Sequence, residues 1–436
     1  MTISKRFFQN KTKFITSYFK GVPKLKNEYG SLNNLLTHVL TLPYNKTEIS
    51  GIEELPEILR LMAPLNHGFN PEQVIRILDH PNEELNREFR IISTTAESID
   101  IIKPSEIVIA TGNIQPFNIE AMPLGYSIVY EDLDKGIVCF KNKSLKSPGI
   151  LKVIDQIPPN GYLETWSKFA RVVAGSSINS VGDFKDNFKT PFHPNYPDAE
   201  KTGDGKEGAV GTHGFAKWTY SLSSGTAPKE TDKPIDMPLL DWIVIGDDRS
   251  FYLMIKTTGV ADNSNYSYDL VGFGNFYSYN EKETFNICLQ AKDGFMAANT
   301  TTDLSPTRPR SYFGALDYNY SGFILTDAYG SHETNYGRVK SYGNFISNNN
   351  LNVPWDSSDI KTVIPGAYIY DRLLIKDFYN FIRGHYRGIS ILYGNNLPDK
   401  YVLQNKISIQ VQQPITTTAL TKASMLFDLT DWEEIL

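Results

Sequence analysis

Residues 241–255 read DWIVIGDDRSFYLMI, and this stretch indicates the fold class. It consists of an apolar run, a Gly-Asp-Asp turn and a second apolar run that contains Phe251 and Tyr252. Two β-prone runs joined by such a turn are typical of a β-hairpin. Similar short runs, separated by Gly, Asn and Asp, recur along the chain. We therefore expect a mainly β protein whose surfaces serve packing and display rather than catalysis.

The composition narrows the class of protein further. The chain has 436 residues, which is enough for two or three domains with sizeable cores. Its 12% aromatic content, 31 Gly and 24 Pro favour strands and turns over long helices. The net charge of −6 argues against a nucleic-acid binder. No run approaches 18 consecutive apolar residues, so we expect no membrane contact.

Three regions are predicted along the chain. Residues 1–50 form an N-terminal arm and an amphipathic helix, residues 51–105 a small β module, and residues 106–436 a larger β body, sandwich-like or barrel-like, with long polar loops. The helix is predicted over residues 31–40, where apolar side chains recur on one face and Ser31 is the expected N-cap.

The small module is predicted from three strand-like runs. They lie at residues 73–77, 88–92 and 98–102, with turn-forming residues between them. Residues 51–62 have apolar side chains at helical spacing, but Pro56 would have to lie in the first turn, so their structure stays open.

The residues that usually carry chemistry are sparse. None of the seven His has metal-ligand spacing, and there is no Gly-x-Ser-x-Gly elbow or phosphate-binding loop, so no catalytic residue, metal or cofactor is predicted. The pair Asp247-Asp248 has the chemistry to hold a cation or to act with another acid in glycoside hydrolysis. Adjacent acids at a hairpin tip are more typical turn formers.

The segment Arg383–Gly388, which reads RGHYRG, is the densest basic and aromatic cluster. Its two arginines have three possible roles: a contact with another subunit, hydrogen bonds to carbonyl groups of a twisted loop, or a clamp on a carboxylate or phosphate. The sequence leaves these alternatives open.

The two ends of the chain carry opposite charges. Residues 1–26 hold seven basic residues and no acidic one, and residues 426–436 hold four acidic residues and no basic one. Such ends either dock on neighbouring subunits or are solvated termini. On the first alternative, the arm is detachable and its removal leaves a folded protein that fails to assemble. The candidate assembly contacts are Lys5, Arg6, Arg383, Arg387 and Trp432.

Five segments, taken in order, make the chain similar to a family of virion structural proteins of tailed bacteriophages. These segments are Gly21–Leu25 with Tyr29–Leu40, His67–Phe69 with Val74–Ile77 and Asn86–Ile91, Pro123–Tyr126, Trp242–Asp247 with Phe251–Leu253 and Phe273–Phe276, and Arg383–Ile389. Residues 126–166 follow the family pattern only loosely.

The resemblance implies a non-enzymatic, symmetric, multi-copy part of a phage tail, baseplate or neck. The implied partners are copies of the chain itself and other tail, baseplate or neck proteins. Its implied location is the virion, assembled in the host cytoplasm.

Two alternatives remain from the residues. The first is a tail-tip protein that binds a host surface or glycan, because aromatic faces stack on sugars; core packing explains the same side chains more simply. The tyrosines behind this alternative are Tyr312, Tyr318, Tyr320, Tyr329 and Tyr336. The second is a glycan hydrolase that uses Asp247 or Asp248.

Overall fold

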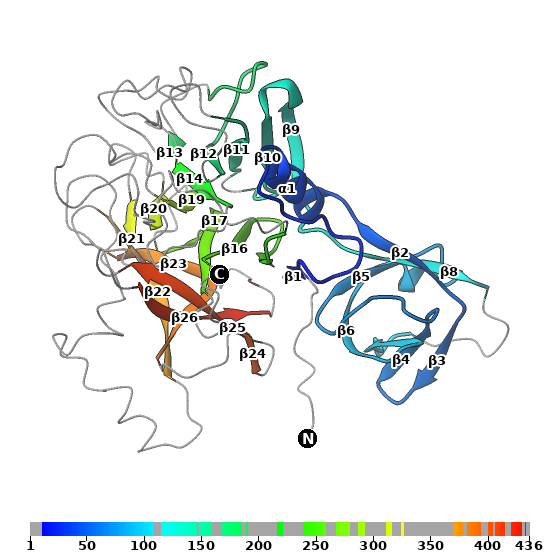
Figure 1. Ribbon diagram of the computed structural model, residues 1–436. Coiled ribbons are helices and arrows are strands. Elements are labelled where there is room, and N and C mark those ends of the chain that lie inside the picture. The colour runs from blue at the N-terminus through cyan, green and yellow to red at the C-terminus, as the bar shows by residue number, and fades with distance from the viewer. Residues whose placement is uncertain are drawn as a thin grey trace, which may run out of the picture.

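The computed structural model confirms a mainly β protein. It describes residues 11–107, 115–145, 148–157, 165, 168–184, 189–190, 216–220, 239–258, 267–279, 287–292, 311–315, 324–326, 369–377, 382–393, 400–403, 406–414, 420–429 and 432. Within these residues the strands form a large curled sheet and a smaller sheet beside it, with one α-helix, α1 (Ser31–Thr41), near their junction (Figure 1).

The large sheet has 19 described strands and contains the predicted hairpin. Its strands are β1 (Lys13–Thr16), β9 (Ser127–Asp132), β10 (Ile137–Lys141), β11 (Ile150–Ile154), β12 (Phe169–Gly175), β13 (Lys189–Thr190), β14 (Ala216–Thr219), β15 (Trp242–Gly246), β16 (Ser250–Thr258), β17 (Ser267–Asn275), β18 (Tyr277–Ser278), β19 (Ile287–Lys292), β20 (Ser311–Ala315), β21 (Ile324–Thr326), β22 (Ile369–Asp377), β23 (Ile382–Tyr393), β24 (Lys400–Leu403), β25 (Lys406–Pro414) and β26 (Leu420–Asp428). β15 and β16 pair antiparallel, so residues 241–255 form the hairpin that their pattern predicts.

The small sheet has seven strands in the order β2-β8-β5-β6-β7-β4-β3. They are β2 (Tyr44–Ile49), β3 (Gly51–Leu55), β4 (Ile58–Met62), β5 (Val74–Leu78), β6 (Glu88–Thr94), β7 (Ser98–Ile102) and β8 (Phe117–Ala121). The three strand-like runs of the module are thus confirmed as β5, β6 and β7. Residues 51–62, left open above, form the β3–β4 hairpin, and the sheet also takes a strand from either side of residues 51–105.

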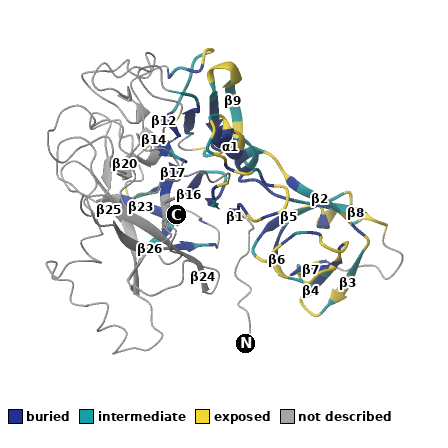
Figure 2. Cartoon of the chain, viewed as in Figure 1, coloured by how far each residue is buried: buried dark blue, intermediate teal, exposed yellow. Residues whose placement is uncertain are grey.

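The small sheet is an insertion in the chain of the large body. The two connections that join it to the body lie side by side. The chain leaves after α1 and returns at Leu124, whose N–H donates to the carbonyl of Val39 at 2.9 Å. The N–H groups of Gly125 and Tyr126 both donate to the carbonyl of Leu40. Exposed residues gather along the outer strands of this sheet and at the β9–β10 hairpin (Figure 2).

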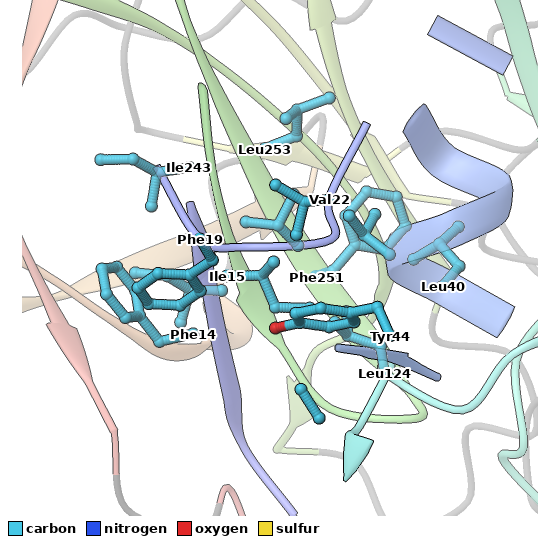
Figure 3. Close-up of a cluster of buried hydrophobic side chains, with 14 of the residues drawn as sticks. Phe14, Ile15, Phe19, Val22, Leu40, Tyr44, Leu124, Ile243, Phe251 and Leu253 are labelled. Atoms are coloured by element: carbon cyan, nitrogen blue, oxygen red, sulfur yellow. The ribbon is translucent and has the colours of Figure 1, made fainter. Parts of the chain in front are cut away.

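One cluster of buried apolar side chains runs through both sheets. Figure 3 shows its centre, where side chains from the N-terminal segment meet α1, β2 and the β15–β16 hairpin. The side chains labelled there are Phe14, Ile15, Phe19, Val22, Leu40, Tyr44, Leu124, Ile243, Phe251 and Leu253. The two sheets therefore share a core.

The expectation that residues 1–26 form a detachable arm is wrong for their described part. β1 pairs antiparallel with β15, with Lys13 opposite Gly246 and Thr16 opposite Ile243. All four residues of β1 are buried, and Phe19 and Leu25 are buried beyond it. In this segment apolar side chains lie between the basic ones. The free energy gained by burying these apolar side chains determines the place of the segment, whatever its basic residues suggest.

Helix α1 is confirmed, but its predicted N-cap is wrong. Gly30 takes the N-cap position in the left-handed conformation, with φ of 87° and no side-chain cap. Ser31 is the first helical residue, and its hydroxyl accepts a hydrogen bond from the N–H of Lys26. The cap comes instead from a distant residue, described below.

Candidate functional site

The candidate site is built around Arg387 of β23, whose guanidinium forms a buried ion pair with Asp247. Nη1 lies 3.0 Å from Oδ1 and Nη2 lies 2.7 Å from Oδ2, so the pair is bidentate. Arg387 is only 2% exposed. Its guanidinium also donates a 3.1 Å hydrogen bond from Nη1 to the hydroxyl of Ser250 and a hydrogen bond from Nη2 to the carbonyl of Trp432.

The turn that holds Asp247 is shaped by the same carboxylate. Oδ1 accepts the N–H groups of Arg249 and Ser250, each at 2.9 Å. The Gly-Asp-Asp sequence therefore forms its turn by side-chain acceptance of backbone donors, as the sequence predicts. The turn also points the carboxylate at Arg387, which the local sequence does not reveal.

Two glycines of the RGHYRG segment let other parts of the chain come close. A Cβ at Gly384 would collide with the carbonyl of Tyr277 on β18, with which β23 pairs. Gly388 has φ of 62°, and a Cβ there would collide with the ring of Trp432. The segment is therefore a strand against which Tyr277 and Trp432 pack closely, because Gly384 and Gly388 have no side chains.

Aromatic side chains close the site from the hairpin side. The hydroxyl of Tyr252 donates to the carbonyl of Arg387 at 2.9 Å, and its ring lies 5.6 Å from that of Trp432. Burial is the main cause that raises the pKa of the Tyr126 hydroxyl well above its usual value, and the nearby carboxylates of Asp247 and Asp248 add to it. These rings exclude water from the ion pair and strengthen it.

A second buried arginine, Arg90 of β6, joins three parts of the chain. Its guanidinium donates to the carbonyls of Thr12 at 2.8 Å, Glu72 at 3.0 Å and Leu429 at 2.9 Å. The Glu72 carboxylate lies 3.9 Å from Nη1, and burial raises its pKa despite the positive charge of Arg90. Arg90 thus links the small sheet to the N-terminal segment and to the segment after β26.

The third buried polar group is Asp155, which caps α1 from outside the helix. Its Oδ2 accepts the N–H groups of Leu32 at 2.9 Å and Asn33 at 3.0 Å, and its Oδ1 accepts the hydroxyl of Tyr220. These bonds stabilise the carboxylate and lower its pKa, but burial raises the pKa by more, so the net shift is upward. Asp155 does for α1 what an N-cap side chain usually does.

The predicted assembly contacts lie in different places. Arg387 and Trp432 are buried by partners within the chain, so their described contacts stabilise the fold, and a role between subunits stays a prediction. Arg383 lies in β23, and its side chain is outside the described residues. Lys5 and Arg6 also lie outside them, as do the side chains of the five tyrosines of the glycan-binding alternative.

The geometry restricts the chemistry that this site performs. Asp247 is 2% exposed and engaged by Arg387, so it offers no free acid or base to a substrate. Among the described residues, no group of three His, Cys, Asp or Glu side chains is placed to hold a metal ion. In the same part of the chain, no helix is both long and apolar enough to cross a bilayer.

One feature of the sequence points to the missed residues Arg90 and Asp155. Each is a charged residue within or directly after an apolar run, EFRII and ILKVID. A charge in such a position is rarely buried without a partner. The pattern therefore flags both residues but does not name their partners, which lie far away in sequence.

The comparisons with known proteins add no relative to this picture. No family model matches the chain, and no curated protein matches it.

Proposed function

We propose that this protein is a multi-copy structural component of a tailed bacteriophage virion, in the tail, baseplate or neck. The observation that carries the proposal is the ordered series of five segments, from Gly21–Leu25 to Arg383–Ile389, that resembles this family of virion proteins. Its partners on this proposal are copies of itself and neighbouring virion proteins.

The places of these segments in the fold support the proposal. Trp242–Asp247 and Arg383–Ile389 meet at the buried ion pair between Asp247 and Arg387. Gly384 and Gly388 stand where no larger residue fits. The segments that resemble the family therefore contain residues that determine how the chain packs, and such residues determine the architecture of a fold.

A non-enzymatic role is part of the same proposal. The hydrolase alternative needs a carboxylate that is free to donate or accept a proton beside a substrate. Asp247 is held by Arg387, two backbone N–H groups and a closed aromatic wall. This supports a structural use of the carboxylate, and Asp248 is half-buried in the same turn.

The test combines the mass of the purified full chain, from light scattering, with cryo-electron microscopy of the particles that contain it. We expect a defined ring or other closed oligomer whose density lies in the tail, baseplate or neck. A stable monomer that is absent from the particle density would contradict the proposal.

The predicted contacts at Lys5 and Arg6 have a test of their own. Reversing both charges (K5E with R6E) is expected to reduce assembly, because the new carboxylates would repel the acidic groups of a neighbouring subunit that Lys5 and Arg6 are proposed to attract. The matched control reverses Lys46 on β2 and Lys143 after β10, which are both exposed. Equal loss of assembly in both double variants would show that only net charge matters and would remove Lys5 and Arg6 from the interface.

A further inference from the structure

Six strands of the large sheet each carry a single charged residue, and all six of these residues are basic. The strands are β10, β11, β12, β13, β14 and β19 (Figure 1). Their charged residues are Lys141, Lys152, Arg171, Lys189, Lys217 and Lys292. Within the bounds of these strands the sequence has no Asp or Glu, so any negative charge near them comes from other segments.

The register places all six positions on one face of the sheet. Arg171 lies opposite Lys217, and Lys217 lies opposite Lys292, so three basic positions stand in line across β12, β14 and β19. Residues two or four apart on a strand share a face, which adds the other three positions. Lys141 lies opposite Ile150, Lys152 opposite Val173 and Lys189 opposite Gly175. The other face carries Val172 and Trp218, which belong to the main core.

A row of like charges in this register favours a counter-charge beside it. Cations directly opposite each other on neighbouring strands repel, because neighbouring strands lie only about 4.8 Å apart. Arg171 is 3% exposed, and burial lowers its pKa to about 10, while its interaction with Tyr29 acts in the opposite direction. The repulsion between the strands and the burial of Arg171 therefore both favour an anion against this face.

One position of the row shows which kind of anion this face accepts. Lys152 is 2% exposed, and its Nζ lies 3.1 Å from Oδ1 of Asp183. The next residue, Phe184, is buried in the same apolar cluster as Cys139 and Val173, which lie opposite Lys152 on the two neighbouring strands. A chain segment that offers a carboxylate beside an apolar side chain therefore fits this face.

We propose that Lys189, Lys217 and Lys292, which we call the basic row, bind an extended acidic segment of a partner protein. Its carboxylates pair with these lysines as Asp183 pairs with Lys152. Charge complementarity selects this occupant, and the carboxylate contact already present on the face favours a protein over a nucleic acid, as does the net charge of −6. The proposal goes beyond the virion role, and its test does not depend on that role.

The first experiment measures binding of a short fluorescent peptide of alternating Glu and Val to the full chain by anisotropy. At low salt this peptide is expected to bind about tenfold more tightly than the same peptide with Gln in place of Glu, and added salt should weaken the binding. Equal binding of the two peptides, or binding of neither, would overturn the proposal. Tighter binding of a DNA duplex than of the Glu peptide would overturn the choice of a protein partner.

Charge variants locate the binding on the basic row. K217Q with K292Q is expected to weaken binding of the Glu peptide about fivefold, whereas K217R with K292R keeps the charges and should bind like wild type. The matched control is K20Q with K46Q, which removes two exposed lysines from other parts of the chain. An equal loss in the control pair would show that only net charge matters and would overturn the assignment to this face.

A second measurement uses the unmodified chain and so does not depend on the folding of a variant. A carbodiimide joins carboxylates to amines that they contact, and mass spectrometry then identifies the lysines linked to the Glu peptide. Links to Lys189, Lys217 or Lys292 are expected in excess over links to Lys20 and Lys46. Links spread evenly over these five lysines, or none to the basic row, would overturn the proposal.

Discussion

At the scale of single residues, the fold depends on charged groups that are buried in pairs and held by several hydrogen bonds. Removing two charges from water is expensive, and their attraction offsets this only when the remaining donors and acceptors are also engaged. Arg387 approaches this condition through hydrogen bonds to Ser250 and Trp432, and Asp247 through the N–H groups of Arg249 and Ser250. Removing one member of the pair should therefore cost much more stability than replacing both members by uncharged residues.

Replacing Arg387 by Met is expected to destabilise the fold by about 3–5 kcal/mol, because Asp247 is left buried and unpaired. Adding Asp247→Asn to that variant should recover part of the loss, since the amide oxygen still accepts the two turn N–H groups and no charge remains. Urea unfolding of both single variants and the double variant measures this coupling. Additive losses would show that the two side chains do not act as a pair.

At the scale of elements, α1 shows how a helix is completed by a residue far from it in sequence. Gly30 offers no side chain at the N-cap, and Asp155, 123 residues from Leu32, supplies the missing acceptor. A negative group at a helix N-terminus also interacts favourably with the helix dipole. The helix boundary is thus local, but its capping is tertiary.

Asp155→Ala is expected to lower the free energy of unfolding by roughly 2–4 kcal/mol, because the N–H groups of Leu32 and Asn33 and the Tyr220 hydroxyl lose their acceptor. Asp155→Asn is the matched control: its carbonyl oxygen can accept both N–H groups, and its amide can donate to Tyr220. Thermal and urea unfolding at neutral pH should separate the two variants clearly. Equal losses would contradict the capping role.

The same control predicts a pH dependence. The pKa of Asp155 is raised in the folded state, so the folded chain holds this proton more tightly than the unfolded chain. Its contribution to stability is full below the unfolded pKa and is lost as pH rises through the raised folded pKa. The stability of Asp155→Asn relative to wild type should therefore increase as pH rises above about 4, and a difference that stays constant with pH would contradict the shift.

His80, in the loop after β5, predicts the opposite dependence for the small sheet. Its Nδ1 accepts the N–H of Asn82 at 2.9 Å, its ring lies edge-on to Phe117, and burial lowers its pKa below 6.5. The stability it contributes is present above the unfolded pKa and is lost as pH falls through the lowered folded pKa. His80→Asn keeps an acceptor near Nδ1 and should reduce the acid loss seen in urea unfolding at pH 5. An acid loss as large as that of the wild type would contradict the role of His80.

At the scale of the whole molecule, the N-terminal segment lies between the two sheets and contacts both. β1 pairs with β15 of the large sheet, and Lys13 forms a 2.8 Å ion pair with Glu88 of the small sheet. Arg90 adds the bond to Thr12. The segment is therefore part of the core that both sheets share.

Deleting residues 2–19 is expected to unfold the protein, because it removes Phe14, Ile15 and Phe19 from the core, each worth about 1.5–3 kcal/mol of burial. Deleting only residues 2–10 removes Lys5 and Arg6 but leaves β1 in place, and its expected effect is on assembly. Circular dichroism melting and size-exclusion chromatography distinguish the two outcomes. Cooperative melting of the longer deletion near the wild-type temperature would contradict the place of β1.

How far the sequence predicts this protein depends on the separation of the interacting residues. Helix α1, strands β5 to β7 and the β15–β16 hairpin follow from periodicity, because their hydrogen bonds join near neighbours. The pair Asp247–Arg387, at a separation of 140 residues, leaves no local pattern. Each member alone has a sufficient local explanation, as a turn former or a surface cation, and only the fold brings them together.

The pairing of β1 with β15 has a consequence for the way the chain is made. Ribosomes add about 5–20 residues per second, so Lys13 emerges roughly 10–50 seconds before its partner Gly246 exists. During that interval Phe14, Ile15 and Phe19 have no sheet to cover them, and for its earlier part α1 also lacks Asp155, the carboxylate that caps it. The segment that carries β1 is therefore synthesised early but cannot take its place in the sheet until residue 246 has been made, and its apolar side chains stay uncovered until then.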